Sequence, residues 1–244
     1  MMIALMMIDW RIQWINETSS TNDDVLKAAR VGEAEGLVVV AERMTAGRGR
    51  HGRPWHAPPG NLYCSVLLHP QGGFQNLAHY AFIAGMAVHS TCASFLPHHA
   101  VQLKWPNDVR VEGKKISGIL LETEMVAHTM CLVMGVGVNI MSVAAPVKEI
   151  ATSMAQLGAA QSVPNVLSSL LLHLNHWLAL YHQQGFDPIR AAWEDHVDRA
   201  CQYQTPLGLG LFCGLQKDGS LQLRLHDGRL TTITAEDVRL VHEN

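Results

Sequence analysis

The chain has 244 residues, 48% of them apolar, which is enough for one sizeable core and a small second domain. Its net charge of −3 excludes the broadly basic surface of a general nucleic-acid-binding protein. Five cysteines lie far apart without a C-x-x-C pair, which is typical of reduced thiols, and the fourteen histidines form no recognisable zinc pattern. The apolar start at residues 1–8 has no positively charged region and soon meets Asp9 and Arg11, so we expect no signal peptide. The other apolar stretch, at 166–181, is too short and too polar to span a membrane, and we expect a cytoplasmic protein.

Strands and helices alternate in the first part of the chain. An apolar–polar alternation at 10–15 predicts a strand, and the acidic residues that follow Ser20 and Thr21 suit the first turn of a helix that Gly32 ends. Two further strands and a long helix are expected at 37–41, 62–68 and 77–95.

The second part begins with a run of strands and ends in two helices. We expect strands at 101–105, 109–111, 116–124 and 130–138, then helices at about 164–184 and 188–197. From residue 198 onward short strands surround the Asp-Gly turns at 218–219 and 227–228, which predict hairpins. The sequence therefore predicts a large domain of strands and helices at 1–197 and a small β domain at 198–244.

The loop at 47–55 reads Gly-Arg-Gly-Arg-His-Gly-Arg-Pro-Trp. Glycines let a backbone approach a ligand closely, and arginines bind carboxylates and phosphates through a planar fork of donors. The loop also contains a G-x-G-x-x-G pattern, but Pro54, Pro58 and Pro59 prevent the helix that a dinucleotide-binding fold needs. We therefore expect a site for a small anionic ligand, with a surface turn of solvated arginines as the alternative.

Three other segments carry suitable residues at strand ends. Segment 104–108 reads Lys-Trp-Pro-Asn-Asp, segment 113–120 brings a lysine ahead of an interior glycine, and segment 135–139 has two glycines on one face before an amide. An interior strand glycine marks a place where another group approaches the backbone. Each segment has a structural explanation alone, but their order along the chain favours one shared site.

These segments, in this order and spacing, resemble those of the biotin protein ligases. The resemblance covers nearly the whole chain, from about residue 12 to its end. The resemblance implies an α+β fold: a mixed β-sheet flanked by helices, related to class II synthetase catalytic domains, with a C-terminal SH3-like β-barrel. It also implies activation of biotin by ATP as biotinyl-5′-AMP and transfer to a lysine of a biotin carboxyl carrier protein, for which the acetyl-CoA carboxylase subunit is the natural candidate. Mg²⁺ would accompany ATP.

The resemblance also implies roles for individual residues. Lys115, Arg48 and Arg50 would carry the catalysis. The biotin-binding residues would be Ser20, Thr21, Asn22, Arg48, Gly49, Arg50 and Lys115. The ATP-binding residues would be Arg50, Trp55, Lys104, Asn107, Asp108, Lys115 and Asn139, and no metal-binding residue is expected.

One position departs from the family, because Met44 replaces a glutamine that usually helps to bind biotin. Two other functions therefore stay open: a ligase for another acid such as lipoate or octanoate, and a catalytically silent binding module of the same fold. The residues ahead of Trp10 leave no room for a DNA-binding helix-turn-helix, so we expect no repressor function. A homodimer through a sheet edge is compatible with the sequence.

Overall fold

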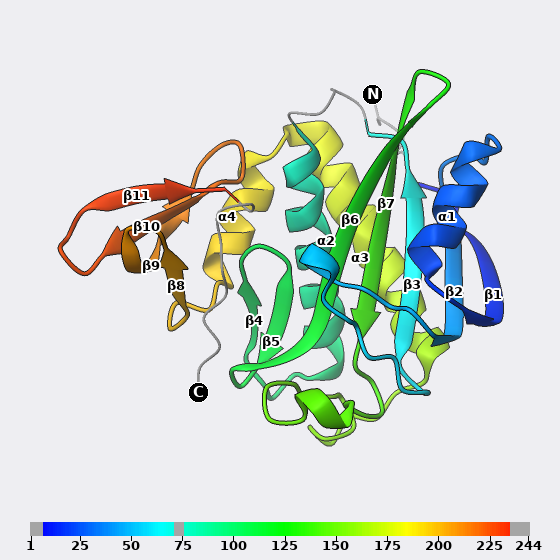
Figure 1. Cartoon of the computed structure of the whole chain (residues 1–244), viewed down its shortest axis with the longest axis horizontal. Helices are drawn as coiled ribbons and strands as arrows, with labels where there is room; N and C mark the ends of the chain where they lie inside the picture. Colours follow the sequence, from blue (N-terminus) through cyan, green and yellow to red (C-terminus); the bar gives the residue numbers. More distant parts are fainter. Residues whose placement is uncertain (1–6, 71–75, 235–244) are drawn as a thin grey trace.

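A seven-stranded mixed sheet forms the centre of the molecule, in a computed structural model that describes residues 7–70 and 76–234 (Figure 1). The strand order is β1-β2-β3-β7-β6-β5-β4; β1 and β2 pair in parallel and all other neighbours are antiparallel. The strands are β1 (Arg11–Thr18), β2 (Leu37–Met44), β3 (Leu62–Leu68), β4 (Val101–Lys104), β5 (Asp108–Val111), β6 (Lys114–Val126) and β7 (Thr129–Val138).

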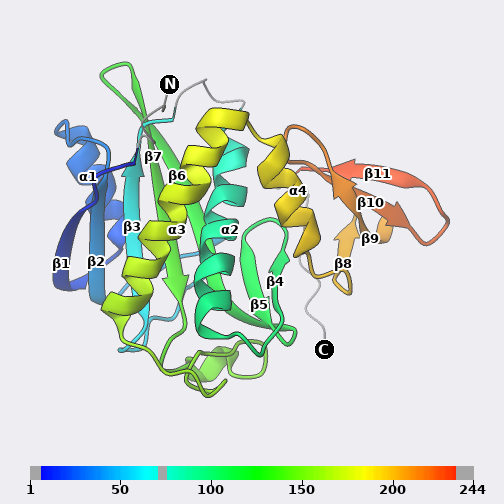
Figure 2. The same ribbon diagram turned by 180° about the vertical axis from the view of Figure 1, so that it is seen from behind.

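Helices cover the two faces of this sheet unequally. α1 (Thr21–Arg30) lies alone on one face, and α2 (Leu77–Phe95), α3 (Val163–Gln184) and α4 (Asp187–Asp195) lie on the other (Figures 1 and 2). The alternation of strand side chains divides the core accordingly, because Val38 and Val40 join the large cluster while Leu37 and Val39 join the cluster under α1. No helix in the described residues is long and apolar enough to cross a membrane.

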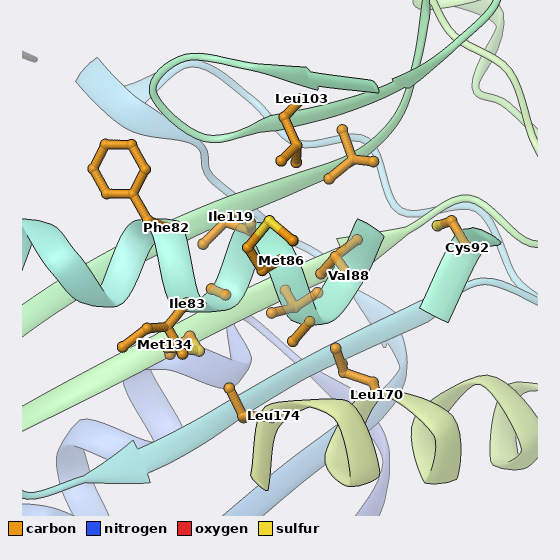
Figure 3. Close-up of a cluster of buried hydrophobic side chains, with 14 of the residues drawn as sticks. Phe82, Ile83, Met86, Val88, Cys92, Leu103, Ile119, Met134, Leu170 and Leu174 are labelled. Atoms are coloured by element: carbon orange, nitrogen blue, oxygen red, sulfur yellow. The ribbon is translucent and has the colours of Figure 1, made fainter. Parts of the chain in front are cut away.

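The large cluster surrounds α2, which is apolar on nearly every side. Figure 3 shows Phe82, Ile83 and Met86 of α2 among side chains from the sheet and from α3. A helix that is hydrophobic all round is buried on several sides, and α2 packs against the sheet, α3 and α4 (Figure 2). This packing fixes one face of the sheet as core and leaves the α1 face to carry a site.

The C-terminal unit is a four-stranded antiparallel sheet in the order β11-β10-β9-β8. Its contact with the first domain is built on Trp105, whose indole N–H donates to the Gly219 carbonyl at 3.2 Å and whose ring packs edge-on against Tyr203. The Leu215 N–H also donates to Glu194 of α4 at 2.7 Å. The strands are β8 (Gln202–Thr205), β9 (Gly208–Leu215), β10 (Leu221–Leu225) and β11 (Leu230–Ile233).

The predicted α+β class, with a mixed sheet, flanking helices and a C-terminal β unit, is confirmed. Two strands are clearly longer than predicted. β6 extends beyond the predicted 116–124 at both ends, and β2 continues past the apolar run to Met44 because it pairs in parallel with β1 as far as Thr18. The domain boundary after residue 197 stays a prediction. Residues 1–6 of the apolar start and 235–244 of the C-terminal domain lie outside the described residues.

Candidate active site

A cavity of about 590 Å³ opens on the α1 face of the sheet, beneath the loop at 47–55. Its walls come from the start of α1, from that loop, from the turn between β4 and β5, and from β6 and β7. Every residue predicted to bind biotin or ATP lines it: Ser20, Thr21, Asn22, Arg48, Gly49, Arg50, Trp55, Lys104, Asn107, Asp108, Lys115 and Asn139. The sequence segments that suggested one shared site are therefore brought together.

Glycines make the floor of this cavity. A Cβ built on Gly137 would lie 2.6 Å from Cζ2 of Trp55, and one on Gly118 would lie 2.9 Å from Cζ3 of the same ring. A Cβ on Gly135 would overlap the amide of Asn22. These three positions thus admit the Trp55 ring and the Asn22 amide against the sheet, which explains the interior glycines of β6 and β7.

The loop at 47–55 closes on itself through backbone contacts. The Gly49 N–H donates to the Arg53 carbonyl at 2.7 Å, and the Trp55 N–H donates to the Gly47 carbonyl at 2.9 Å. A Cβ on Gly47 would lie 2.7 Å from the Trp55 carbonyl oxygen, so the loop can close only with glycine there. His51 at its tip adopts a left-handed φ of 57°, which is unfavourable for a residue with a side chain.

The two arginines of this loop have different environments. Arg48 forms ion pairs with Asp23 at 2.7 Å and with Glu122 at 2.9 Å. The hydrogen bond to Arg48 lowers the pKa of Asp23, and the hydrogen bonds to Asp23 and Glu122 raise the pKa of Arg48. Burial lowers the pKa of Arg50, whose guanidinium remains a cation because arginine titrates far above neutral pH.

Lys115 lines the cavity from the start of β6. Its ammonium lies 2.6 Å from Oδ1 of Asp108 and 5.3 Å from the centre of the Trp55 ring. The backbone of Lys115 also binds the segment after β7, donating to the Ile150 carbonyl and accepting from Thr152. The segment after β7 thus fixes the main chain of Lys115, and Asp108 fixes the position of its ammonium group.

Two amides hold the surrounding backbone. The Asn107 side chain donates to the Ile119 carbonyl at 2.7 Å, and that of Asn139 donates to the Thr152 carbonyl at 3.0 Å. Trp105, by contrast, is 2% exposed and does not line the cavity. The Trp105 ring therefore packs against the C-terminal sheet, whereas the other four residues of the 104–108 segment line the cavity.

Met44 forms part of the wall near the start of α1. Its Sδ lies 3.8 Å from Oγ1 of Thr21, and a thioether is only a weak hydrogen-bond acceptor. The structure thus puts the departure from the family pattern inside the site.

Sequence reasoning missed three residues that hold the predicted ones. Asp23 and Glu122 bind Arg48, and the buried Ser65 hydroxyl lies within hydrogen-bond distance of Thr21 and Asn22. Asp23 carried only the signal of an acid in a first helical turn, and Ser65 that of a polar residue inside an apolar strand.

Among the described residues, no three His, Cys, Asp or Glu side chains are grouped to hold a metal ion.

Comparisons with known proteins agree with this geometry. Residues 14–139 match the model of the "Biotin/lipoate A/B protein ligase family". The biotin–[acetyl-CoA-carboxylase] ligase of Paracoccus denitrificans is 34% identical over 235 residues, covering 90% of this chain and 96% of that protein. The bifunctional ligase/repressor BirA of Bacillus spizizenii is 31% identical, covering 91% of this chain and 71% of that protein.

Among solved structures, the biotin protein ligase of Aquifex aeolicus in complex with biotin and ATP superimposes with a TM-score of 0.80 at 26% identity. That alignment covers 94% of this chain and 97% of the Aquifex chain, so it includes both the mixed sheet and the C-terminal unit. The family model matches more than half of the chain, and the Paracoccus ligase is 34% identical over almost the whole of both proteins. The chain therefore belongs to the biotin/lipoate A/B protein ligase family.

Proposed function

We infer that the protein is a biotin protein ligase, which activates biotin with ATP as biotinyl-5′-AMP and transfers it to a lysine of a biotin carboxyl carrier protein. The observation that carries the inference is the convergence of Arg48, Arg50 and Lys115 on one cavity. A carboxylate and a triphosphate repel each other, and cations held at fixed positions offset that repulsion in the transition state.

In the first step the biotin carboxylate attacks the α-phosphate of ATP, forming an anhydride and releasing pyrophosphate. Lys115 is the proposed stabiliser of the charge on the carboxyl and bridging oxygens, and Asp108 orients its ammonium through the 2.6 Å ion pair. Trp55 is proposed to contact the adenine. Its indole N–H is buried and has no hydrogen-bond partner among the described residues.

In the second step the carrier lysine attacks the anhydride carbonyl, and AMP leaves with the bonding electrons. The mixed anhydride is hydrolysed readily, so the loop at 47–55 has to exclude water until the carrier arrives. Arg48, Gly49 and Arg50 are proposed to cover the intermediate, while Ser20, Thr21 and Asn22 bind the ureido ring and Lys104, Asn107 and Asn139 the nucleotide side.

Mg²⁺ is proposed to enter with ATP and to neutralise part of the phosphate charge. The cavity offers the oxygen donors that Mg²⁺ prefers, in the carboxylate of Asp108 and the amide of Asn139. The biotin carrier of acetyl-CoA carboxylase is the proposed partner, and the cytoplasm, where ATP is abundant, is the proposed compartment. The five cysteines are free thiols, as a reducing compartment requires.

The test is incubation of the protein with ATP, Mg²⁺, biotin and a carrier domain, followed by intact mass measurement of the carrier. We expect one added biotinyl group, and none when ATP is omitted or the acceptor lysine is replaced by arginine. Parallel incubations contain lipoate or octanoate in place of biotin. Modification with those acids alone would identify the alternative ligase, and no modification with any acid would identify a silent module.

A further inference from the structure

Glu122 of β6 connects two parts of the site without lining the cavity itself. Its carboxylate accepts a hydrogen bond from the Asn22 side-chain nitrogen at 2.6 Å and further bonds from Arg48 at 2.9–3.2 Å. Glu122 points to the same sheet face as Gly118 and Leu120, which do line the cavity. It is therefore placed to act on the ligand through other residues.

The carboxylate determines how the Asn22 amide is oriented. An ionised carboxylate only accepts hydrogen bonds, so Asn22 must present its NH₂ group to Glu122 and its oxygen to Ser65. Ser65 is fully buried, and its Oγ lies 2.5 Å from that amide oxygen and 2.7 Å from Oγ1 of Thr21. These contacts form a continuous chain from Glu122 to the cavity wall.

The hydrogens of this chain can run in only one direction. Ser65 has a single hydroxyl hydrogen, and the amide oxygen has none to give, so Ser65 donates to Asn22. The 2.7 Å contact between Ser65 and Thr21 then needs the hydrogen of Thr21. The competing acceptor for that hydrogen, Sδ of Met44 at 3.8 Å, is much weaker. Thr21 is thereby left facing the cavity as a hydrogen-bond acceptor.

We propose that Glu122 is a positioning residue that makes Thr21 an acceptor for an N–H group of the substrate. The inference rests on the proposed function, since the ureido ring of biotin carries two N–H donors, whereas lipoate and octanoate carry none. A glutamine at 122 can donate as well as accept, so it allows the Asn22 amide to turn over and the chain to reverse. The Thr21 hydroxyl would then present a hydrogen to the ureido N–H.

The experiment is calorimetric measurement of the biotin Kd for the intact protein without ATP. Glu122→Gln is expected to raise the Kd about tenfold, the loss of one well-aligned hydrogen bond to a buried partner. Glu122→Asp retains an acceptor-only group and should restore part of the affinity. Glu124→Gln is the matched control, because Glu124 lies on the same strand and pairs with Arg30 at the surface; its Kd should equal that of the wild type.

A second comparison separates the hydrogen-bond chain from the grip on Arg48. Asp23→Asn removes a carboxylate from Arg48 but leaves Asn22 in contact with Glu122. An equal rise in Kd for Asp23→Asn and Glu122→Gln would show that Glu122 acts through Arg48, and the proposal would be wrong. Ser65→Ala breaks the chain without touching either acid, and it is expected to weaken biotin binding as well.

A double-mutant cycle gives the decisive result. In a Thr21→Val background, which removes the hydroxyl, Glu122→Gln should have no further effect on the Kd. An undiminished effect there, or wild-type affinity in Ser65→Ala, overturns the inference even if Glu122→Gln itself is unstable. Absence of biotin binding by the wild type would instead overturn the proposed function, so the two failures are distinguishable.

Discussion

Replacing Gly137 with alanine should selectively weaken the binding of ATP. The added Cβ would lie 2.6–2.9 Å from three atoms of the Trp55 ring, about 1 Å closer than ordinary carbon contacts allow. The strand backbone at Gly137 is fixed on both sides by β3 and β6, so the ring has to move. Overpacking of this kind costs roughly 1–3 kcal/mol, and a loop residue that can yield belongs in the lower part of that range.

A loss of about 1–2 kcal/mol corresponds to a roughly 5- to 30-fold higher KM for ATP. Steady-state biotinylation of a carrier domain at saturating biotin measures it, and the KM for biotin should change little. Gly214→Ala is the control, because a Cβ there meets its nearest neighbour at 3.8 Å. A wild-type KM for ATP in Gly137→Ala would refute the argument that the glycine floor seats Trp55 for the nucleotide.

Four further variants test other parts of the account. Lys115→Ala should lower the rate of adenylate formation at least about a hundredfold, measured by rapid quench; an unchanged rate would remove Lys115 from the mechanism. Arg50→Gly should release biotinyl-5′-AMP, so that mass spectrometry detects biotin on bystander proteins; retention as tight as in the wild type would argue against a covering loop. Met44→Gln should lower the biotin Kd about two- to tenfold by adding one hydrogen bond, and calorimetry showing weaker binding would contradict this. Burial and the neighbouring His196 lower the pKa of His89 to about 4, so the unfolded chain binds a proton that the folded one excludes. Stability should therefore fall as the pH drops from about 6.5 to about 4, by at most about 3 kcal/mol. In urea unfolding, the free energy of unfolding of His89→Asn should depend less on pH than that of the wild type. An equal pH dependence would refute the assignment of this effect to His89.

The spacing of apolar residues and the turn-forming residues predicted the elements of this fold well, because each strand and helix carries its own local pattern. The helix at 77–95 and the strand at 62–68 were predicted with the bounds that the structure has. The glycines of segment 135–139 also indicated a close approach to the backbone, although the sequence could not say that Trp55 and Asn22 would fill the space. That information depends on pairing between distant parts of the chain.

The residues that hold the predicted site residues in place could not be recognised from the sequence for the same reason. Glu122 lies 74 residues from Arg48 and 100 from Asn22, and in a strand it reads as one more solvated acid. Trp105 belongs to the same short segment as residues proposed to bind the nucleotide, but its ring is held against the C-terminal unit by a hydrogen bond to Gly219. Sequence patterns predicted which residues carry the chemistry, and only the sheet register shows which neighbours orient them.

The exchange of labelled pyrophosphate into ATP tests the central claim most directly, because it reports whether the converging cations join an acid to the nucleotide. We expect the wild-type protein to catalyse this exchange when biotin is present and to show only background exchange without it. Exchange that proceeds equally without biotin, or that responds to lipoate and not to biotin, would contradict the account.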